Sequence, residues 1–73
     1  MLGRVIRCRK DKGYAFIRAE EDNNTYFCHF SKVADGTLEV GYQVNFVIGF
    51  DYENDRPYAK NVQIVDSWYR SYK

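Results

Sequence analysis

The sequence predicts an all-β fold, a small closed or nearly closed barrel of five short strands. Large and small side chains alternate with a period of two, which sends successive residues of a strand to opposite faces. Turn-forming residues separate the alternating runs, and outside the last eight residues no run of helical length has apolar residues at i, i+3 and i+4. At 73 residues the chain makes one domain with a small core.

The strands follow one another with short polar connections. Gly13 closes the first connection, because glycine takes a positive φ without steric cost. Ser31 is expected to cap a short helical turn over residues 31–34. Pro57 opens the last strand, where a missing N–H is tolerated. We expect the five strands at residues 3–10, 14–19, 25–30, 42–50 and 57–65.

Two of these runs alternate aromatic rings with small or aliphatic residues. Tyr14 and Phe16 point to one face, and Phe27 and His29 lie on the matching face of the next strand. The opposite face carries Ala15, Ile17, Tyr26 and Cys28. The remaining core is expected to consist of Val5, Val44, Phe46, Ile48, Val62 and Ile64. Flat rings on an outer sheet face are platforms on which unpaired bases can stack.

The charge is distributed unevenly along the chain. Residues 1–18 hold six basic residues against Asp11, a balance of +5, and residues 19–73 hold five basic and nine acidic ones, a balance of −4. The basic part coincides with the first aromatic run, as expected of a surface that meets nucleic acid. The alternative is an ordinary solvated strand surface.

Cysteine usage and hydropathy exclude several protein classes. Cys8 and Cys28 are too few for a disulfide framework, and with His29 they give at most three zinc ligands. We therefore expect free thiols in a reducing compartment, no metal and no cofactor. No segment has the length of a signal peptide's apolar run or of a bilayer span, so we expect a cytoplasmic protein. No Gly-rich phosphate loop and no catalytic group of residues is recognisable, so we expect no enzymatic activity.

Several motifs resemble, in order and spacing, those of the cold-shock domain. The resemblance covers roughly residues 3–65 and implies an OB-type barrel that binds single-stranded RNA or DNA with little sequence preference. Members of that family act as RNA chaperones or as regulators of transcription or translation. The motifs are Gly3-x-Val5, Lys12-Gly13-Tyr14-Ala15-Phe16-Ile17, Tyr26-Phe27-Cys28-His29-Phe30-Ser31, Leu38-x-x-Gly41-x-x-Val44-x-Phe46 and Ala59-x-Asn61-Val62.

The resemblance also implies which residues contact the strand. Base-stacking positions fall on Tyr14, Phe16, Phe27, His29 and Phe30, and the basic position at the start of the motif falls on Lys12. Further candidates for phosphate contacts are Arg7, Arg56 and Lys60.

The chain departs from the family pattern in its first strand. Arg7 stands where the family has a base-stacking Trp, and a guanidinium can both stack and pair with phosphate. The connection between the third and fourth strands is shorter than usual and lacks its aromatic residue. Tyr52 and Tyr58 are candidate replacements. We expect fewer stacked bases and a larger contribution of charge to affinity.

Two other interpretations stay open. The barrel, residues 1–65, could serve as a protein-interaction or regulatory module, since the usual Trp is absent and the second half is acidic. It could also be the N-terminal domain of a longer polypeptide, with the aromatic tail, residues 66–73, as its linker. For the isolated chain we expect a monomer rather than a dimer, without a small-molecule substrate and without membrane contact.

Overall fold

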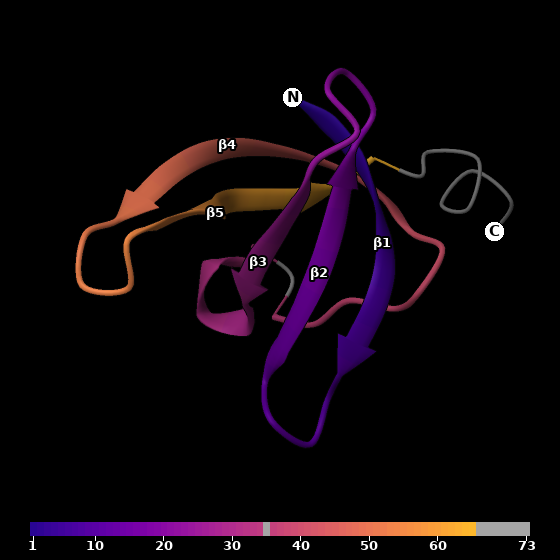
Figure 1. Cartoon of the computed structure of the whole chain (residues 1–73). Helices are drawn as coiled ribbons and strands as arrows, with labels where there is room; N and C mark the ends of the chain where they lie inside the picture. The colour runs from indigo at the N-terminus through magenta and orange to yellow at the C-terminus, as the bar shows by residue number, and fades with distance from the viewer. Residues whose placement is uncertain (35, 66–73) are drawn as a thin grey trace, which may run out of the picture.

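The all-β fold is confirmed by a computed structural model, which describes residues 1–34 and 36–65 (Figure 1). Five strands close into a barrel in the order β1-β2-β3-β5-β4. Each strand begins and ends within one residue of the bounds expected from sequence. The expected aromatic tail, residues 66–73, lies outside the described part of the chain. The elements are β1 Leu2–Arg9, β2 Tyr14–Ala19, β3 Thr25–His29, the short 3-10 helix η1 Phe30–Lys32, β4 Gln43–Asp51 and β5 Arg56–Ile64.

The first three strands form an antiparallel meander, and β4 and β5 form a long antiparallel hairpin that crosses behind it (Figure 1). β1 pairs with β4 in antiparallel orientation at residues 2–4. The barrel closes on its other side where β3 meets β5 in parallel orientation, at Phe27 and Tyr58. Alternation within each strand cannot reveal this parallel closure, because it depends on where two distant strands meet.

The interior is built from one face of each strand. Val5, Ile17, Val44, Phe46 and Val62 are buried, as predicted, and Ile64 packs against them while partly exposed. Tyr26 and Cys28 also point inward. The connection between η1 and β4 adds Val33 and Leu38, both buried, to this core.

The prediction that Ile48 belongs to the core is wrong, since its side chain is 38% exposed. It pairs with buried Ala59 across the hairpin, so its face is the expected one. However, β1 pairs with β4 only as far as Asn45, and beyond that point β5 is the single described strand that pairs with β4. The hairpin therefore extends past the barrel and leaves Ile48 near solvent (Figure 1).

The short helical turn begins earlier than expected and has a different cap. It spans Phe30–Lys32, and the Nδ1 atom of His29 accepts a hydrogen bond from the backbone N–H of Ser31 at 3.2 Å. Ser31 is thus inside the turn, and its hydroxyl lies 2.9 Å from the same nitrogen. An imidazole that accepts from the backbone performs the capping that the sequence assigned to a hydroxyl.

Candidate nucleic-acid interface

Register across β2 and β3 brings the aromatic residues together on the outer face of the sheet. Tyr14 pairs with His29, and Phe16 pairs with Phe27. The ring centroids of Tyr14, Phe16 and Phe27 lie 5.3 to 5.8 Å apart, and two of the three contacts are edge-to-face. All three rings are half-buried, so each presents part of its surface to solvent. We call these three residues the ring cluster.

An arginine column borders the ring cluster on β1 and consists of Arg4, Arg7 and Arg9. A β-bulge between Val5 and Arg7 makes this possible. Strict alternation from inward-facing Val5 would turn Arg7 into the barrel, but the extra residue, Ile6, resets the phase and leaves Arg7 paired with Phe16. The cation is thus on the same face as the rings.

The cations around the cluster differ in how they are held. Arg4 donates from Nη1 to the carbonyl of Gly41 at 2.6 Å, and Arg9 forms a weak ion pair with Asp11 at 3.5 Å. Within the described residues, the side chains of Arg7 and Lys12 make no hydrogen bond or ion pair. Both are exposed and remain available to a phosphate.

His29 and Phe30 follow one another at the end of β3 but lie in different environments. His29 is exposed beside Tyr14, and its Nδ1 is occupied by the two contacts to Ser31, so its Nε2 edge faces outward from the turn. Phe30 lies at the start of η1 and packs partly against the core. Phe30 therefore lies outside the ring cluster, although the family resemblance implies base stacking for both His29 and Phe30.

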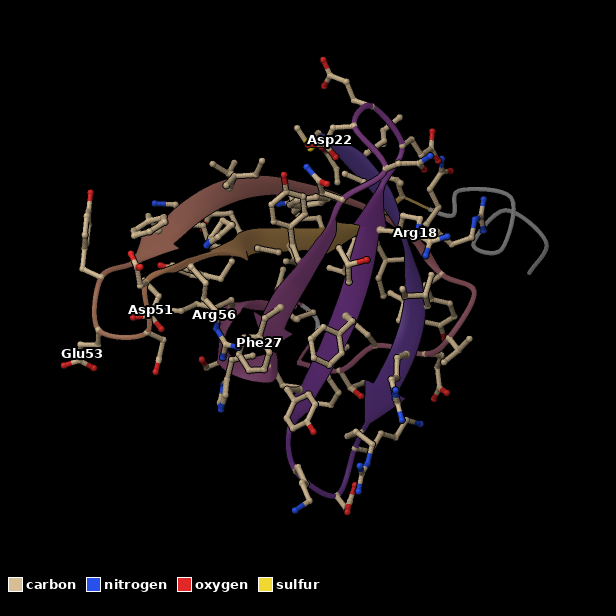
Figure 2. The ribbon with its side chains drawn as sticks, viewed as in Figure 1. Arg18, Asp22, Phe27, Asp51, Glu53 and Arg56 are labelled. Atoms are coloured by element: carbon tan, nitrogen blue, oxygen red, sulfur yellow. The ribbon has the colours of Figure 1, made fainter. Side chains whose placement is uncertain are left out.

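β5 adds three more candidate residues to this side of the sheet. Tyr58 pairs with Phe27, and the guanidinium carbon of Arg56 lies 4.6 Å from the centroid of the Phe27 ring (Figure 2). Lys60 follows Tyr58 by two residues and so shares its face, half-buried. The ammonium group of Lys32 lies 5.9 Å from the Tyr58 ring centroid.

The β4–β5 hairpin contributes two more aromatic residues: Tyr52, whose position the sequence leaves open, and Phe50, which the sequence does not single out. Phe50 and Tyr52 make an edge-to-face contact with a centroid distance of 4.9 Å, and both are exposed. Together with Tyr58 they line a groove, the hairpin groove, that opens beside Phe27 and His29. The density of aromatics around Asp51 is a usable sequence signal, but only the tertiary path of the hairpin shows that they line the same groove as Phe27.

Other kinds of site find no support in the part of the chain that the structure describes. No group of three or more His, Cys, Asp or Glu residues there is arranged to hold a metal ion. Cys8 and Cys28 are free, and each pairs with Ala15 from opposite sides, so the two thiols lie two strands apart. No helix within residues 1–34 and 36–65 has the length and apolarity needed to cross a membrane.

Comparison with known proteins agrees with this geometry. Residues 1–65 match the family model described as the 'Cold-shock' DNA-binding domain. A relative named "Cold shock-like protein", from Aquifex aeolicus (strain VF5), is 41% identical over 66 residues, which cover 86% of this chain and 91% of the relative.

Proposed function

The chain belongs to the cold-shock domain family, whose members bind nucleic acid and are not enzymes, and we propose that it holds single-stranded RNA or DNA on the outer face of β1, β2 and β3. Bases would stack on Tyr14, Phe16 and Phe27, with His29 extending the row. Phosphates would pair with the cations beside them, namely Arg7, Lys12, Arg56 and Lys60.

The single observation that carries this proposal is the pairing of Phe16 with Phe27 next to Arg7. Rings that are half-exposed on adjacent strands accept bases of any sequence, because every base has a π-face. Three stacked bases contribute a gross gain of about 3–9 kcal/mol. Micromolar affinity corresponds to about 8 kcal/mol, so stacking and a few phosphate contacts are sufficient for moderate binding. Tight, sequence-defined recognition is not required.

In the cell such binding would trap unpaired strands. A protein that binds only the single-stranded form shifts the equilibrium of a weak hairpin toward the open form, without ATP. We propose this as the basis of an RNA-chaperone role, or of a regulatory role in transcription or translation.

The direct test is a titration of a fluorescent oligopyrimidine against the Phe16→Ala, Phe27→Ala double variant. Loss of two stacking platforms should weaken binding by about 30-fold or more. Leu2→Ala, Val40→Ala is the matched control, since it removes two exposed apolar side chains, neither of which belongs to the ring cluster or pairs with a proposed phosphate contact. Equal affinity of a folded double variant and the parent would show that bases do not stack on these rings.

The salt dependence of affinity distinguishes the second candidate function, a protein-interaction module, from single-strand binding. A single-stranded partner that neutralises about three phosphates gives a log–log slope of affinity against salt near −2. An interface of mixed charge with another protein need not show such a slope. Failure of oligonucleotides to bind at low salt would favour the protein-interaction module.

A further inference from the structure

The hairpin groove has the size and lining of a ligand site. Its volume is about 530 Å³, within the usual range for small-molecule pockets. Its walls come from β3, η1 and the β4–β5 hairpin, so they combine segments that are far apart in the chain. The residues that line it are Phe27, His29, Lys32, Phe50, Asp51, Tyr52, Glu53 and Tyr58.

Aromatic residues at this position do not serve the core. Tyr52 is 86% exposed and Phe50 43% exposed, and the two contact each other rather than the barrel interior. Two large rings that stay in water on a projecting hairpin form a candidate contact surface. Because Tyr58 also lines the groove, a flat ligand would meet rings from both strands of the hairpin.

The groove is continuous with the proposed strand-binding face. Phe27 belongs to both, and His29, which pairs with Tyr14, also lines the groove. A strand that stacks a base on Phe27 would therefore place its next nucleotide at the groove entrance. This continuity favours a nucleobase of the same strand as the occupant.

The charges in the groove favour the base over the phosphate. Two carboxylates, Asp51 and Glu53, line it, and Lys32 is the single cation among the described lining residues. Asp51 accepts hydrogen bonds at Oδ2 from the Asn54 side-chain amide and at Oδ1 from the backbone N–H groups of Asn54 and Glu53, and these bonds hold the pKa of Asp51 below its ordinary value. Oδ2 accepts one of the three bonds and so keeps a lone pair for a further donor. Within the described residues the Glu53 carboxylate has no hydrogen-bond or ion-pair partner.

A carboxylate accepts hydrogen bonds and has none to donate, so it discriminates between base edges. The N4 amino group of cytosine donates to a carboxylate, whereas the O4 atom of uracil at the same position is an acceptor. Uracil would therefore bring two acceptors together in a partly desolvated groove.

We propose that the hairpin groove is a terminal subsite that binds one nucleobase with an exocyclic amino group, and that it selects cytosine over uracil. The base stacks among Phe50, Tyr52 and Tyr58, and its amino edge faces Asp51 and Glu53. The inference rests on the proposed function, and it adds base selectivity at one position to a surface that is otherwise indifferent to sequence.

The test uses the full chain and a set of oligodeoxyuridines that carry one deoxycytidine, placed at each position in turn. A single position, at one end of the bound segment, should bind about fivefold tighter or more with deoxycytidine than with deoxyuridine. The Asp51→Asn, Glu53→Gln variant should remove this preference, because both substitutions keep side-chain size and replace a carboxylate, which only accepts, with an amide, which can donate to O4 of uracil as well as accept from N4 of cytosine.

A second pair of variants tests the rings. Phe50→Ser, Tyr52→Ser should weaken binding of an oligonucleotide that reaches the groove by about fivefold or more, and should leave a shorter one unaffected. Leu2→Ser is the matched control: Leu2 is 44% exposed, about as much as Phe50, and its partner Asn45 lies five residues before Phe50 on β4.

The outcomes distinguish this inference from the proposed function. If all oligonucleotides bind the parent and the hairpin variants equally, while the Phe16→Ala, Phe27→Ala variant loses binding, the subsite is wrong and the function stands. If the parent binds no oligonucleotide, both fail. If the parent self-associates in sedimentation and Tyr52→Ser abolishes this, the groove holds a second copy and the proposal is overturned.

Discussion

The guanidinium carbon of Arg56 lies 4.6 Å from the centroid of the Phe27 ring (Figure 2). Arg56 begins β5, opposite Asp51 at the end of β4, so the hairpin delivers a cation onto a ring of the proposed stacking surface. A base that stacks on this face of Phe27 has to displace the guanidinium or stack on it. Either way, Arg56 is positioned to meet the phosphate next to that base.

The first prediction concerns the contact between Arg56 and the Phe27 ring. Arg56→Gln should weaken oligonucleotide binding and reduce the slope of log affinity against log salt by about 0.7, the contribution of one phosphate on a single strand. Stability should change by less than about 1 kcal/mol, since exposed cation–π contacts are weak. Lys10→Gln is the control, because it removes the same charge from a side chain that pairs with Glu39. An unchanged slope for Arg56→Gln would mean that Arg56 meets no phosphate.

A substitution at Arg7 should strengthen oligonucleotide binding instead of weakening it. Arg7 pairs with Phe16 at the position where cold-shock domains have a base-stacking Trp. Arg7→Trp should add a stacking platform worth about 1–3 kcal/mol, while the salt slope falls by about 0.7 as a cation is lost. Titration at several salt concentrations measures both quantities. Arg7→Gln, which removes the charge without adding a ring, separates the two effects, and if Arg7→Trp binds no more tightly than Arg7→Gln, no base reaches this position.

The turn between β2 and β3 should respond to acid. The Asp22 carboxylate accepts hydrogen bonds from the backbone N–H of Asn24 at 2.9 Å and from the Tyr26 hydroxyl at 2.8 Å, and these bonds lower the pKa of Asp22 below 3.8. A lowered pKa means that this stabilisation is fully present above about pH 4 and is lost as the pH falls through the folded-state value. Denaturant unfolding of the parent and of Asp22→Asn should therefore differ at pH 7 and converge near pH 2. A constant difference across this range would exclude the carboxylate as its cause.

The sequence predicts most of the outer face because strand alternation needs no tertiary information. A period of two is enough to separate Phe16 and Phe27 from Ile17 and Cys28, and the two predictions agree with register and burial. The same rule fails where the period is interrupted. A bulge in β1 and another in β5 shift the alternation, and Arg7 lies on the outer face only because of the bulge in β1.

The hairpin side of the site could not be predicted in this way. Whether Tyr58 meets Phe27 depends on a parallel contact between strands that are separated by the whole of β4. The exposure of Ile48 and Phe50 depends on how far the hairpin extends past the barrel. Local patterns specify which face a residue takes, but not whether another strand covers that face.

Close packing at the start of β1 gives a stability prediction. A Cβ atom on Gly3 would lie 2.7 Å from the Ile17 Cγ2 atom, 2.8 Å from the Arg18 carbonyl oxygen and 2.9 Å from a Phe46 ring carbon. Because one of these neighbours is backbone, Gly3→Ala should destabilise the fold by about 1–3 kcal/mol. Thermal or urea unfolding measures this. Ala19→Gly, at the position paired with Gly3, is a comparison that shortens a side chain instead of adding one, and an unchanged midpoint for Gly3→Ala would mean that β1 does not pack this closely.

The two thiols should react at different rates. Burial raises the pKa of Cys28 to about 11, and its side chain is fully enclosed in the barrel. Cys8 is partly exposed; burial also raises its pKa, and its thiol lies 3.2 Å from the Leu38 carbonyl oxygen. Since the thiolate is the nucleophile, iodoacetamide at pH 8 should modify Cys8 first and reach Cys28 only through unfolding. Mass spectrometry over time, with and without urea, follows both sites, and early modification of Cys28 in the folded protein would place the inner face of β3 in solvent and contradict the barrel.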